Sequence, residues 1–102
     1  DIGHHFPPGD AEYENADSRG LTRSVLALIT ADGWAVNNAD LTLVCETPKI
    51  GPHVMAMRTN LAADLGIDIS AVSVKATTTE GLGFCGRGEG IAAMAVVSLV
   101  AA

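Results

Sequence analysis

Aromatic side chains are scarce in this chain, which has one Trp, one Tyr and two Phe among its 102 residues. Because 48% of the residues are nonetheless hydrophobic, a core would have to be built from Val, Leu, Ile, Ala and Met. The length allows one domain at most. A small domain this apolar often buries the rest of its apolar surface in an oligomer.

Basic residues are also few, with six Lys and Arg against twelve Asp and Glu and a net charge of −6. This balance argues against general nucleic-acid binding, which needs a basic surface. It also means that a diphosphate ligand would be held by metal ions and oriented backbone amides rather than by a basic field.

The chain has two cysteines and no paired cysteine motif, so a disulfide scaffold is not indicated. Cys45 falls at an inward position of an alternating segment, which predicts a buried and inert thiol. The longest apolar stretch, residues 91–102, is too short to cross a bilayer. We therefore expect a bacterial cytosolic protein without a membrane segment.

Two helices are predicted from apolar spacing and from their ends. Asp17 or Ser18 can cap the first helix, and Gly33 can stop it. Gly51-Pro52 can start the second helix, and Gly66 can close it. The expected inward residues are Leu21, Val25, Leu28 and Ile29 in the first helix and Val54, Met57, Leu61 and Leu65 in the second.

Strands are predicted where apolar residues alternate with polar ones, at residues 41–46 and 72–76. Residues 1–16 are rich in Gly, Pro and acids and are expected to form a loop. The segment from Ile91 is ambiguous, because its alanines favour a helix and its valines a strand. Taken as a strand, it gives an α/β (α+β) fold with helices on one face of a mixed sheet.

The most informative segment is residues 76–84, which read ATTTEGLGF and are followed by GRGEGI at 86–91. Glycine backbone can approach an anion closely, and threonine hydroxyls can donate to phosphate oxygens. A carboxylate beside such a site would repel a bare phosphate, so Glu80 is better suited to hold a divalent cation. The alternative is a Thr-rich strand end that runs into a flexible turn.

This segment is the last of four motifs that occur in order along the chain. The others are Asp1-Ile2-Gly3 with Phe6-Pro7 and Asp10, then Ala16-Asp17-Ser18-Arg19, then Pro48-Lys49 with Pro52-His53. Together they resemble the 2-C-methyl-D-erythritol 2,4-cyclodiphosphate synthase family, the cyclases of the non-mevalonate isoprenoid pathway. The resemblance runs from the first residue to the last and favours a strand for the segment from Ile91.

The resemblance implies a chorismate-mutase-like homotrimeric prism with active sites between neighbouring subunits. It implies a metal-dependent phosphorus-oxygen lyase that cyclises 4-diphosphocytidyl-2-C-methyl-D-erythritol 2-phosphate and releases CMP. Two other functions remain open. The chain could belong to a bifunctional cytidylyltransferase-cyclase, or it could be a catalytically silent module that binds cytidine nucleotides or isoprenoid diphosphates.

The nucleotide site that the resemblance implies has two parts. The first is a loop for cytosine and ribose, with Lys49 near the phosphates, and the second would contact the diphosphate. Thr78 is expected to stabilise the phosphate transition state, and Glu80 to bind magnesium or manganese. The residues concerned are Cys45, Glu46, Thr47, Pro48, Lys49, Ile50 and Gly51 in the loop, and Thr77, Thr78, Thr79 and Glu80 in the second part. For the loop, an ordinary capped connection is the alternative.

Two further groups follow from the resemblance. The first would hold the methylerythritol moiety and comprises Asp1, Ile2, Gly3, Phe6, Pro7, Pro8, Gly9 and Asp10; a mobile surface turn is the alternative. Phe84 and Arg87 match residues that face the central channel of the trimer, where an isoprenoid diphosphate could sit between the three arginines. The alternative is that Glu89 simply pairs with Arg87.

The family's zinc ligands lie in an N-terminal segment that has no counterpart here, so residues 1–102 are interpreted as one cyclase domain that lacks its N-terminal part. The three histidines, His4, His5 and His53, are not at the family's metal positions. Zinc is therefore expected to bind through ligands outside this chain. Asp17-Ser18-Arg19 also matches the family, but a helix cap explains the motif and no chemistry is assigned to it.

Overall fold

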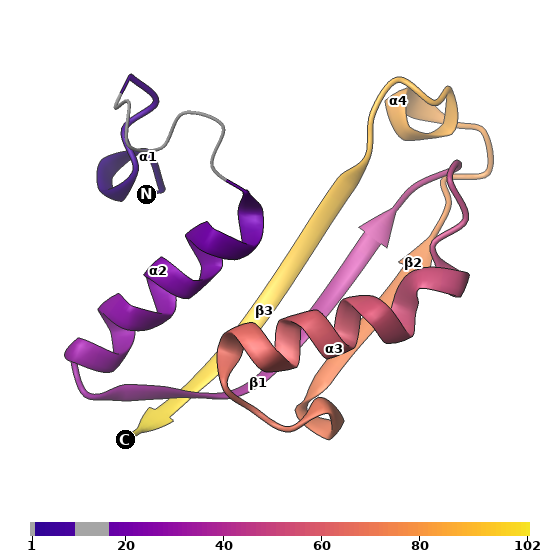
Figure 1. Ribbon diagram of the computed structural model, residues 1–102. Coiled ribbons are helices and arrows are strands. Elements are labelled where there is room, and N and C mark those ends of the chain that lie inside the picture. Colours follow the sequence, from indigo (N-terminus) through magenta and orange to yellow (C-terminus); the bar gives the residue numbers. More distant parts are fainter. Residues whose placement is uncertain (1, 10–16) are drawn as a thin grey trace.

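A mixed three-stranded sheet forms the centre of the computed structural model, which describes residues 2–9 and 17–102 (Figure 1). The central strand β1 (Trp34–Val44) pairs in parallel with β2 (Val72–Thr77) and antiparallel with β3 (Ala92–Ala101). The predicted mixed sheet is confirmed. The segment from Ile91, which was ambiguous, contributes the strand β3.

Both long helices, α2 (Ser18–Ala31) and α3 (Val54–Leu65), lie on the same face of the sheet (Figure 1). Leu41 and its β2 partner Val74 pack with α3. Val97 pairs with Ala39, two residues before Leu41, and lines a cavity beside α2. Because side chains two residues apart on a strand share a face, the register shows that both helices cover the same face of the sheet.

The helix ends follow from local chemistry. The Asp17 carboxylate accepts a hydrogen bond from the Gly20 amide at 2.8 Å and caps α2. Gly66 ends α3 in the left-handed conformation with φ 69°, which glycine adopts without steric cost. Leu28, expected on the inward face of α2, is 45% exposed; Leu26 lines the cavity under the helix instead.

Three local predictions were wrong. The strand β1 begins at Trp34 rather than near Leu41, because residues 34–40 pair with the end of β3. Residues 1–16 were expected to be a loop, yet the short helix α1 (Ile2–His5) lies within them. A second short helix, α4 (Gly83–Gly86), interrupts the expected turn after β2.

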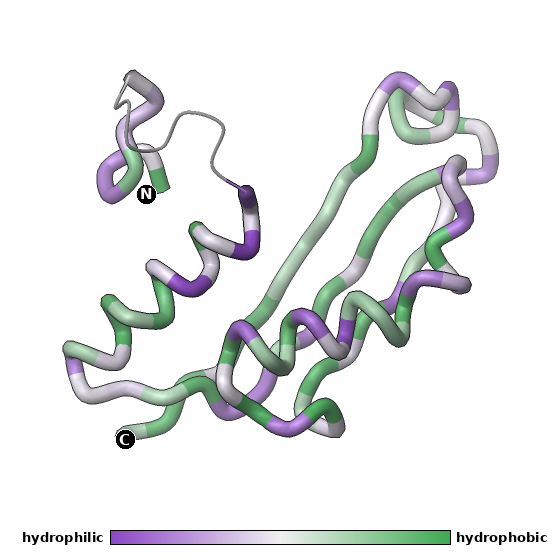
Figure 2. Tube along the Cα trace, viewed as in Figure 1, coloured by the Kyte–Doolittle hydropathy of each residue, from purple (hydrophilic) through white to green (hydrophobic). Residues whose placement is uncertain are grey.

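The core formed by the described residues is small and contains no aromatic ring. Ala62, Val72 and Val74 are buried at its centre, and neighbouring side chains of α3 and β1 pack against them. The opposite face of the sheet is not covered by any of the described elements: Met94 and Val96 are 59% and 72% exposed on it. Apolar residues run along β3 (Figure 2), so a strip of apolar surface remains open. No helix in the described ranges is long and apolar enough to cross a bilayer.

Candidate functional site

Two of the predicted site segments meet at one edge of the sheet. Because β1 and β2 are parallel, their carboxyl ends lie side by side, and the Cys45 amide donates to the Thr77 carbonyl at 3.0 Å. A cavity of about 170 Å³ opens between the two segments. Its lining residues are Cys45, Glu46, Lys49, Ile50, Gly51, Ala76, Thr77 and Thr78.

The loop at residues 45–51 forms one wall of this cavity with Cys45, Glu46, Lys49, Ile50 and Gly51. Cys45 is buried, and its thiol donates to the carbonyl oxygens of Thr47 and Pro48 at 3.0 and 3.5 Å. The thiol therefore shapes the loop and is not presented as a nucleophile. The peptide between Thr47 and Pro48 is cis. Lys49 is exposed on the rim and supplies the positive charge of this cavity.

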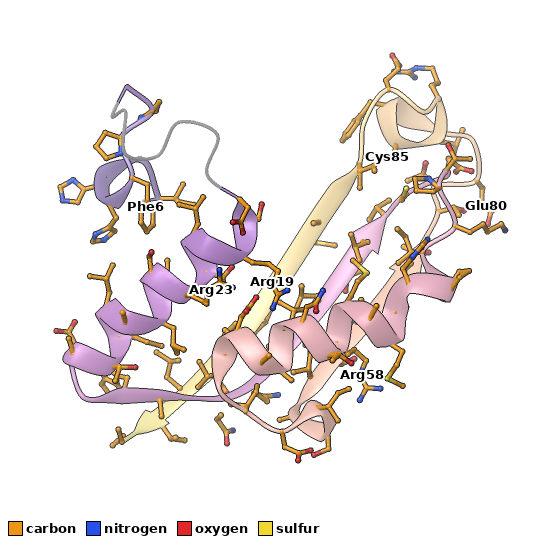
Figure 3. The ribbon with its side chains drawn as sticks, in the orientation of Figure 1. Phe6, Arg19, Arg23, Arg58, Glu80 and Cys85 are labelled. Atoms are coloured by element: carbon orange, nitrogen blue, oxygen red, sulfur yellow. The ribbon has the colours of Figure 1, made fainter. Side chains whose placement is uncertain are left out.

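The segment after β2 turns sharply at residues 78–81. The Thr78 hydroxyl oxygen accepts a hydrogen bond from the Glu80 amide at 3.1 Å and lies 3.3 Å from the Glu80 carboxylate, to which it donates. Glu80 has φ 54°, a conformation that is unfavourable for residues other than glycine. The exposed Glu80 carboxylate lies at this end of the molecule (Figure 3).

Backbone amides in this turn are less available than the glycine-rich sequence predicts. The Gly81 amide donates to Oε1 of Glu46 at 3.1 Å, so it is not directed at an incoming anion. The Thr79 hydroxyl donates to the Leu82 carbonyl. Thr77 and Thr78 line the cavity and remain the candidates for contact with phosphate oxygens.

Glu80 could hold a divalent cation only if a bound substrate supplied further coordinating oxygens. Within residues 2–9 and 17–102 there is no group of three or more His, Cys, Asp or Glu side chains that could hold a metal ion. Magnesium is commonly bound through one or two carboxylates together with substrate phosphates. Glu80 does not line the cavity, but it is hydrogen-bonded to the lining residue Thr78, so its carboxylate is near enough to share a cation with a bound phosphate. The described residues do not form a zinc site.

The predicted methylerythritol residues lie elsewhere in the subunit. Ile2, Gly3, Phe6, Pro7, Pro8 and Gly9 belong to α1 and the residues after it, which lie at the opposite side of the view from Glu80 (Figures 1 and 3). Asp1 and Asp10 lie outside the described residues. The candidate site residues therefore form two separate groups within one chain.

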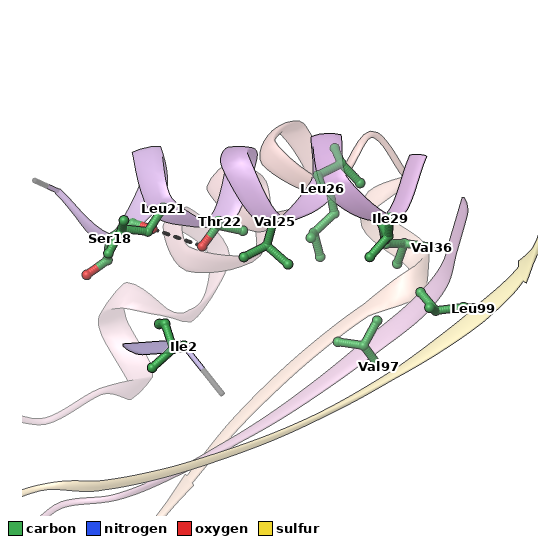
Figure 4. A pocket seen from close by; sticks show the side chains of 11 residues that line it. Ile2, Ser18, Leu21, Thr22, Val25, Leu26, Ile29, Val36, Val97 and Leu99 are labelled. Carbon is green, nitrogen blue, oxygen red and sulfur yellow. Dashed lines mark hydrogen bonds between the residues drawn. The ribbon is translucent and has the colours of Figure 1, made fainter. Parts of the chain in front are cut away.

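A larger cavity in the described ranges is apolar and lies beside Ile2 of the methylerythritol group. It measures about 510 Å³ and lies between Ile2, the inner side of α2 and residues Val97 and Leu99 of β3 (Figure 4). None of the described residues that line it is charged, so they offer nothing to neutralise a diphosphate.

Phe84 and Arg87, the predicted channel residues, lie in and just after α4. Phe84 is 54% exposed. The Arg87 guanidinium forms an ion pair with Glu89, and both side chains are largely exposed. The pairing that the sequence offered as an alternative is thus present, and it leaves Phe84 uncovered.

Sequence reasoning missed an ion-pair cluster outside the cavity. The Asp64 carboxylate in α3 accepts hydrogen bonds from Arg19 and Arg23 of α2. The hydrogen bond from Arg19, with a further contribution from Arg23, holds the pKa of Asp64 below its ordinary value. The cap at Asp17 therefore does not explain the whole of the Asp17-Ser18-Arg19 motif. An acid between the inward residues Leu61 and Leu65 was the available signal.

Comparison with known proteins agrees with this arrangement of motifs. Residues 1–100 match the YgbB family. The chain belongs to that family. It is 57% identical to a 2-C-methyl-D-erythritol 2,4-cyclodiphosphate synthase from Xanthomonas axonopodis pv. citri (strain 306), over 97% of this chain and 60% of the relative. It is 59% identical to the synthase from Alkalilimnicola ehrlichii, over 95% of this chain and 59% of that protein.

Solved structures of YgbB-like chains share the fold. The bifunctional IspDF from Campylobacter jejuni superposes with a TM-score of 0.91 at 37% identity, over 97% of this chain and 27% of that one. The CDP complex of Plasmodium falciparum IspF gives 0.85 at 30% identity, over 99% and 60%. The resemblance inferred from the motifs is confirmed. The chain spans about 60% of the length of the curated YgbB relatives it matches.

Proposed function

We propose that this chain is part of a 2-C-methyl-D-erythritol 2,4-cyclodiphosphate synthase. The observation that carries the proposal is the cavity at the carboxyl ends of β1 and β2, where the loop with Lys49 meets the turn with Thr78 and Glu80. A structure of an IspF relative is a CDP complex. A nucleoside diphosphate needs a cation and hydroxyl donors, which Lys49, Thr77 and Thr78 supply in the cavity lining, and a metal, for which the neighbouring Glu80 offers a carboxylate.

In the proposed reaction the 2-phosphate of 4-diphosphocytidyl-2-C-methyl-D-erythritol 2-phosphate attacks the β-phosphorus of the diphosphate. A new phosphorus–oxygen bond closes the ring as the bond from the β-phosphorus to the bridging oxygen breaks. That oxygen leaves with CMP, and the 2,4-cyclodiphosphate remains. The enzyme is thus a phosphorus-oxygen lyase, and no protein nucleophile is required, which agrees with the commitment of the Cys45 thiol to backbone carbonyls.

The residues of this cavity act by orientation and by electrostatic stabilisation, which dominate phosphoryl transfer. Lys49 attracts the diphosphate from the rim. Thr78 places its hydroxyl where charge develops on the transferred phosphoryl group. Glu80 would hold magnesium or manganese, which would neutralise charge on the diphosphate. Zinc would require ligands beyond the described residues, and no step is assigned to it.

A homotrimer with sites between subunits would join the two groups of candidate residues. Within one chain, α1 and the turn bearing Glu80 lie apart (Figures 1 and 3), and an apolar strip with Met94 and Val96 is open on the sheet. Packing that strip against neighbouring copies would bury it and could bring the methylerythritol group of one subunit to the nucleotide cavity of the next.

Two further features belong to the proposal. Phe84 and Arg87 offer an apolar surface and a cation to an isoprenoid diphosphate in the centre of the trimer. The match to the bifunctional IspDF supports fusion to a cytidylyltransferase as an alternative organisation of the whole protein. The curated relatives are bacterial, and we assign the protein to the bacterial cytosol.

The decisive experiment measures CMP release by the full-length protein from the diphosphocytidyl substrate, with zinc and magnesium present and after their removal by a chelator. We expect release that depends on metal. If CDP binds but no CMP is released under any metal condition, the chain belongs to a catalytically silent binding module and the cyclase proposal is overturned.

A further inference from the structure

Glu46 connects the two segments that form the nucleotide cavity. It lies in the loop at residues 45–51, and its Oε1 accepts a hydrogen bond from the Gly81 amide at 3.1 Å, across 35 positions of sequence. Other hydrogen bonds described for the turn, those of Thr78 and Thr79, are made within residues 78–82. Glu46 is thus the side chain that ties this turn to the opposite wall of the cavity.

A second contact, with α4, also constrains the position of Gly81. A Cβ atom built on Gly86 of α4 would lie 2.2 Å from the Gly81 carbonyl carbon, a distance that no real side chain tolerates. The α4 backbone therefore sits directly against Gly81. Gly81 is thus contacted both by this backbone and by the Glu46 carboxylate, and these two contacts define its place in the structure.

The conformation of the turn makes this support necessary. Glu80 and Gly81 both have positive φ, 54° and 81°, and the left-handed region is unfavourable for a glutamate. Such a conformation persists when surrounding contacts fix it. The Thr78 hydroxyl holds the Glu80 amide from within the turn, and Glu46 holds the next amide from outside it.

We propose that Glu46 is a positioning residue. It presents Thr78 and Glu80 to the diphosphate by holding the Gly81 amide, and it does not contact the nucleotide itself. This inference rests on the proposed cyclase function and changes the role that the sequence assigned to Glu46. The positioning role of Glu46 needs a hydrogen-bond acceptor at the end of a side chain as long as glutamate. The negative charge is dispensable and, beside a diphosphate, unfavourable.

Two substitutions of Glu46 separate the effect of side-chain length from the effect of the negative charge. Glu46→Gln keeps an Oε1 acceptor of the same length without the charge, whereas Glu46→Asp keeps the charge and withdraws the acceptor by one methylene. Asp32→Asn is the matched control, because it removes one carboxylate charge at the exposed C-terminal end of α2. All three variants are made in the full-length protein.

Two measurements are made on each variant: kcat and KM for CMP release, and hydrogen–deuterium exchange of peptides that cover residues 78–84 without substrate. Glu46→Asp is expected to lower kcat about 10–100-fold, as expected for a small misplacement of catalytic groups, with KM changed less than about threefold and with faster exchange of the turn. Glu46→Gln is expected to retain the wild-type kcat and the slow exchange of the turn. Its KM should be unchanged or lower.

The opposite order of effects overturns the inference. If Glu46→Gln is impaired while Glu46→Asp is active, the charge acts on a ligand or cation directly. If Glu46→Asp leaves exchange of the turn unchanged, Glu46 does not hold Gly81. The exchange measurement needs no turnover, so it tests the positioning role even if the wild-type protein releases no CMP and the cyclase proposal fails.

Discussion

Arg19 and Asp64 form a two-point contact between the helices: Nε and Nη2 of the arginine donate to the two carboxylate oxygens at 2.8 and 2.9 Å. Arg23, one turn further along α2, adds a third hydrogen bond to Asp64 at 3.0 Å. The Asp64 side chain is only 4% exposed, and the two arginines lie between α2 and α3 (Figure 3). The cluster fixes the spacing of the two helices that cover the sheet.

Removing this carboxylate should weaken the fold. Asp64→Asn leaves two guanidinium groups without a counter-charge, and breaking a buried pair on one side is more harmful than the pair is helpful. We expect a midpoint of thermal unfolding several degrees lower at pH 7. The arginine side chains are about half exposed, so the loss is smaller than for a fully buried pair.

The same cluster predicts a pH dependence. The hydrogen bond from Arg19 lowers the folded-state pKa of Asp64, so the carboxylate stabilises the fold above its unfolded pKa of about 4. This contribution is lost as the pH falls from that value through the folded pKa. Asp40 and Asp68, whose pKa values are also lowered, remain in Asp64→Asn and serve as the internal control.

The measurement is the free energy of unfolding of the wild type and Asp64→Asn between about pH 6 and pH 2, the range over which a paired carboxylate is titrated. As the pH falls, the free energy of unfolding of the wild type should decrease more steeply than that of Asp64→Asn. The two values should converge at the acid end of the range. Parallel curves would contradict the assignment of the cluster as a stabilising contact.

Gly86 should not tolerate a side chain. Gly86→Ala places a Cβ 2.2 Å from the Gly81 carbonyl carbon, so the turn after β2 must shift. We expect a loss of about 1–3 kcal/mol in the free energy of unfolding, the range for overpacked sites, together with reduced CMP release.

Gly20→Ala is the matched control for this substitution. Its Cβ would meet the Asp17 carboxylate at 3.5 Å, an ordinary contact, within α2. It should stabilise the protein by about 0.5–1 kcal/mol, because alanine is the better helix former. Chemical denaturation measures both; equal stability of Gly86→Ala and the wild type would show that α4 does not press on Gly81.

The elements that local pattern determines could be predicted from the sequence. Gly66 marks the end of α3 because the left-handed conformation there suits glycine, and the alternation around Val72 and Val74 marks β2. The strand β3 was decided by the family resemblance, because its alanines and valines give opposing propensities.

What the sequence does not reveal depends on contacts between distant residues. Residues 34–40 of β1 include the polar residues Asn37, Asn38 and Asp40, which obscure the alternation typical of a strand. This part of the strand forms because it pairs with β3, with a shift in register between Val36 and Asn38. The bond from Gly81 to Glu46 spans 35 positions and the pair of Arg19 and Asp64 spans 45. No local spacing rule reports such pairs.

Thr78 is expected to matter for turnover more than for binding. Thr78→Ala removes the hydroxyl that lines the cavity and that accepts from the Glu80 amide. Loss of one oxyanion-type donor lowers rates about 10²–10³-fold, so kcat for CMP release should fall by that factor while the Kd for CDP rises only modestly. Thr78→Ser keeps the hydroxyl and should retain most activity. Unchanged turnover in Thr78→Ala would remove this residue from the mechanism.

Glu80 should set the requirement for magnesium. Glu80→Gln preserves side-chain length and the left-handed backbone position, but a neutral amide is a weaker ligand for a hard cation. The magnesium concentration for half-maximal activity should rise at least about tenfold, since even groups behind metal ligands contribute about 10–100-fold. Activity titrated with magnesium and with manganese tests this. An unchanged requirement would place the cation on other ligands.

We expect an isoprenoid diphosphate to stabilise the folded protein by binding to Phe84 and Arg87. In the proposed trimer, three Arg87 side chains around the axis would repel one another unless an anion lies between them, and the exposed Phe84 rings would receive an apolar tail. Farnesyl diphosphate should therefore raise the melting temperature of the full-length protein, and inorganic diphosphate, which has no tail, should raise it less.

Substitutions at this position separate the ligand from the ion pair seen in one subunit. Arg87→Ala should abolish the shift, because the anion loses its partner. Glu89→Gln should enlarge it, because Glu89 now pairs with Arg87 and competes with an incoming anion. A wild-type melting temperature that does not respond to farnesyl diphosphate would leave the pair of Arg87 and Glu89 as a local surface contact, with no role in the channel.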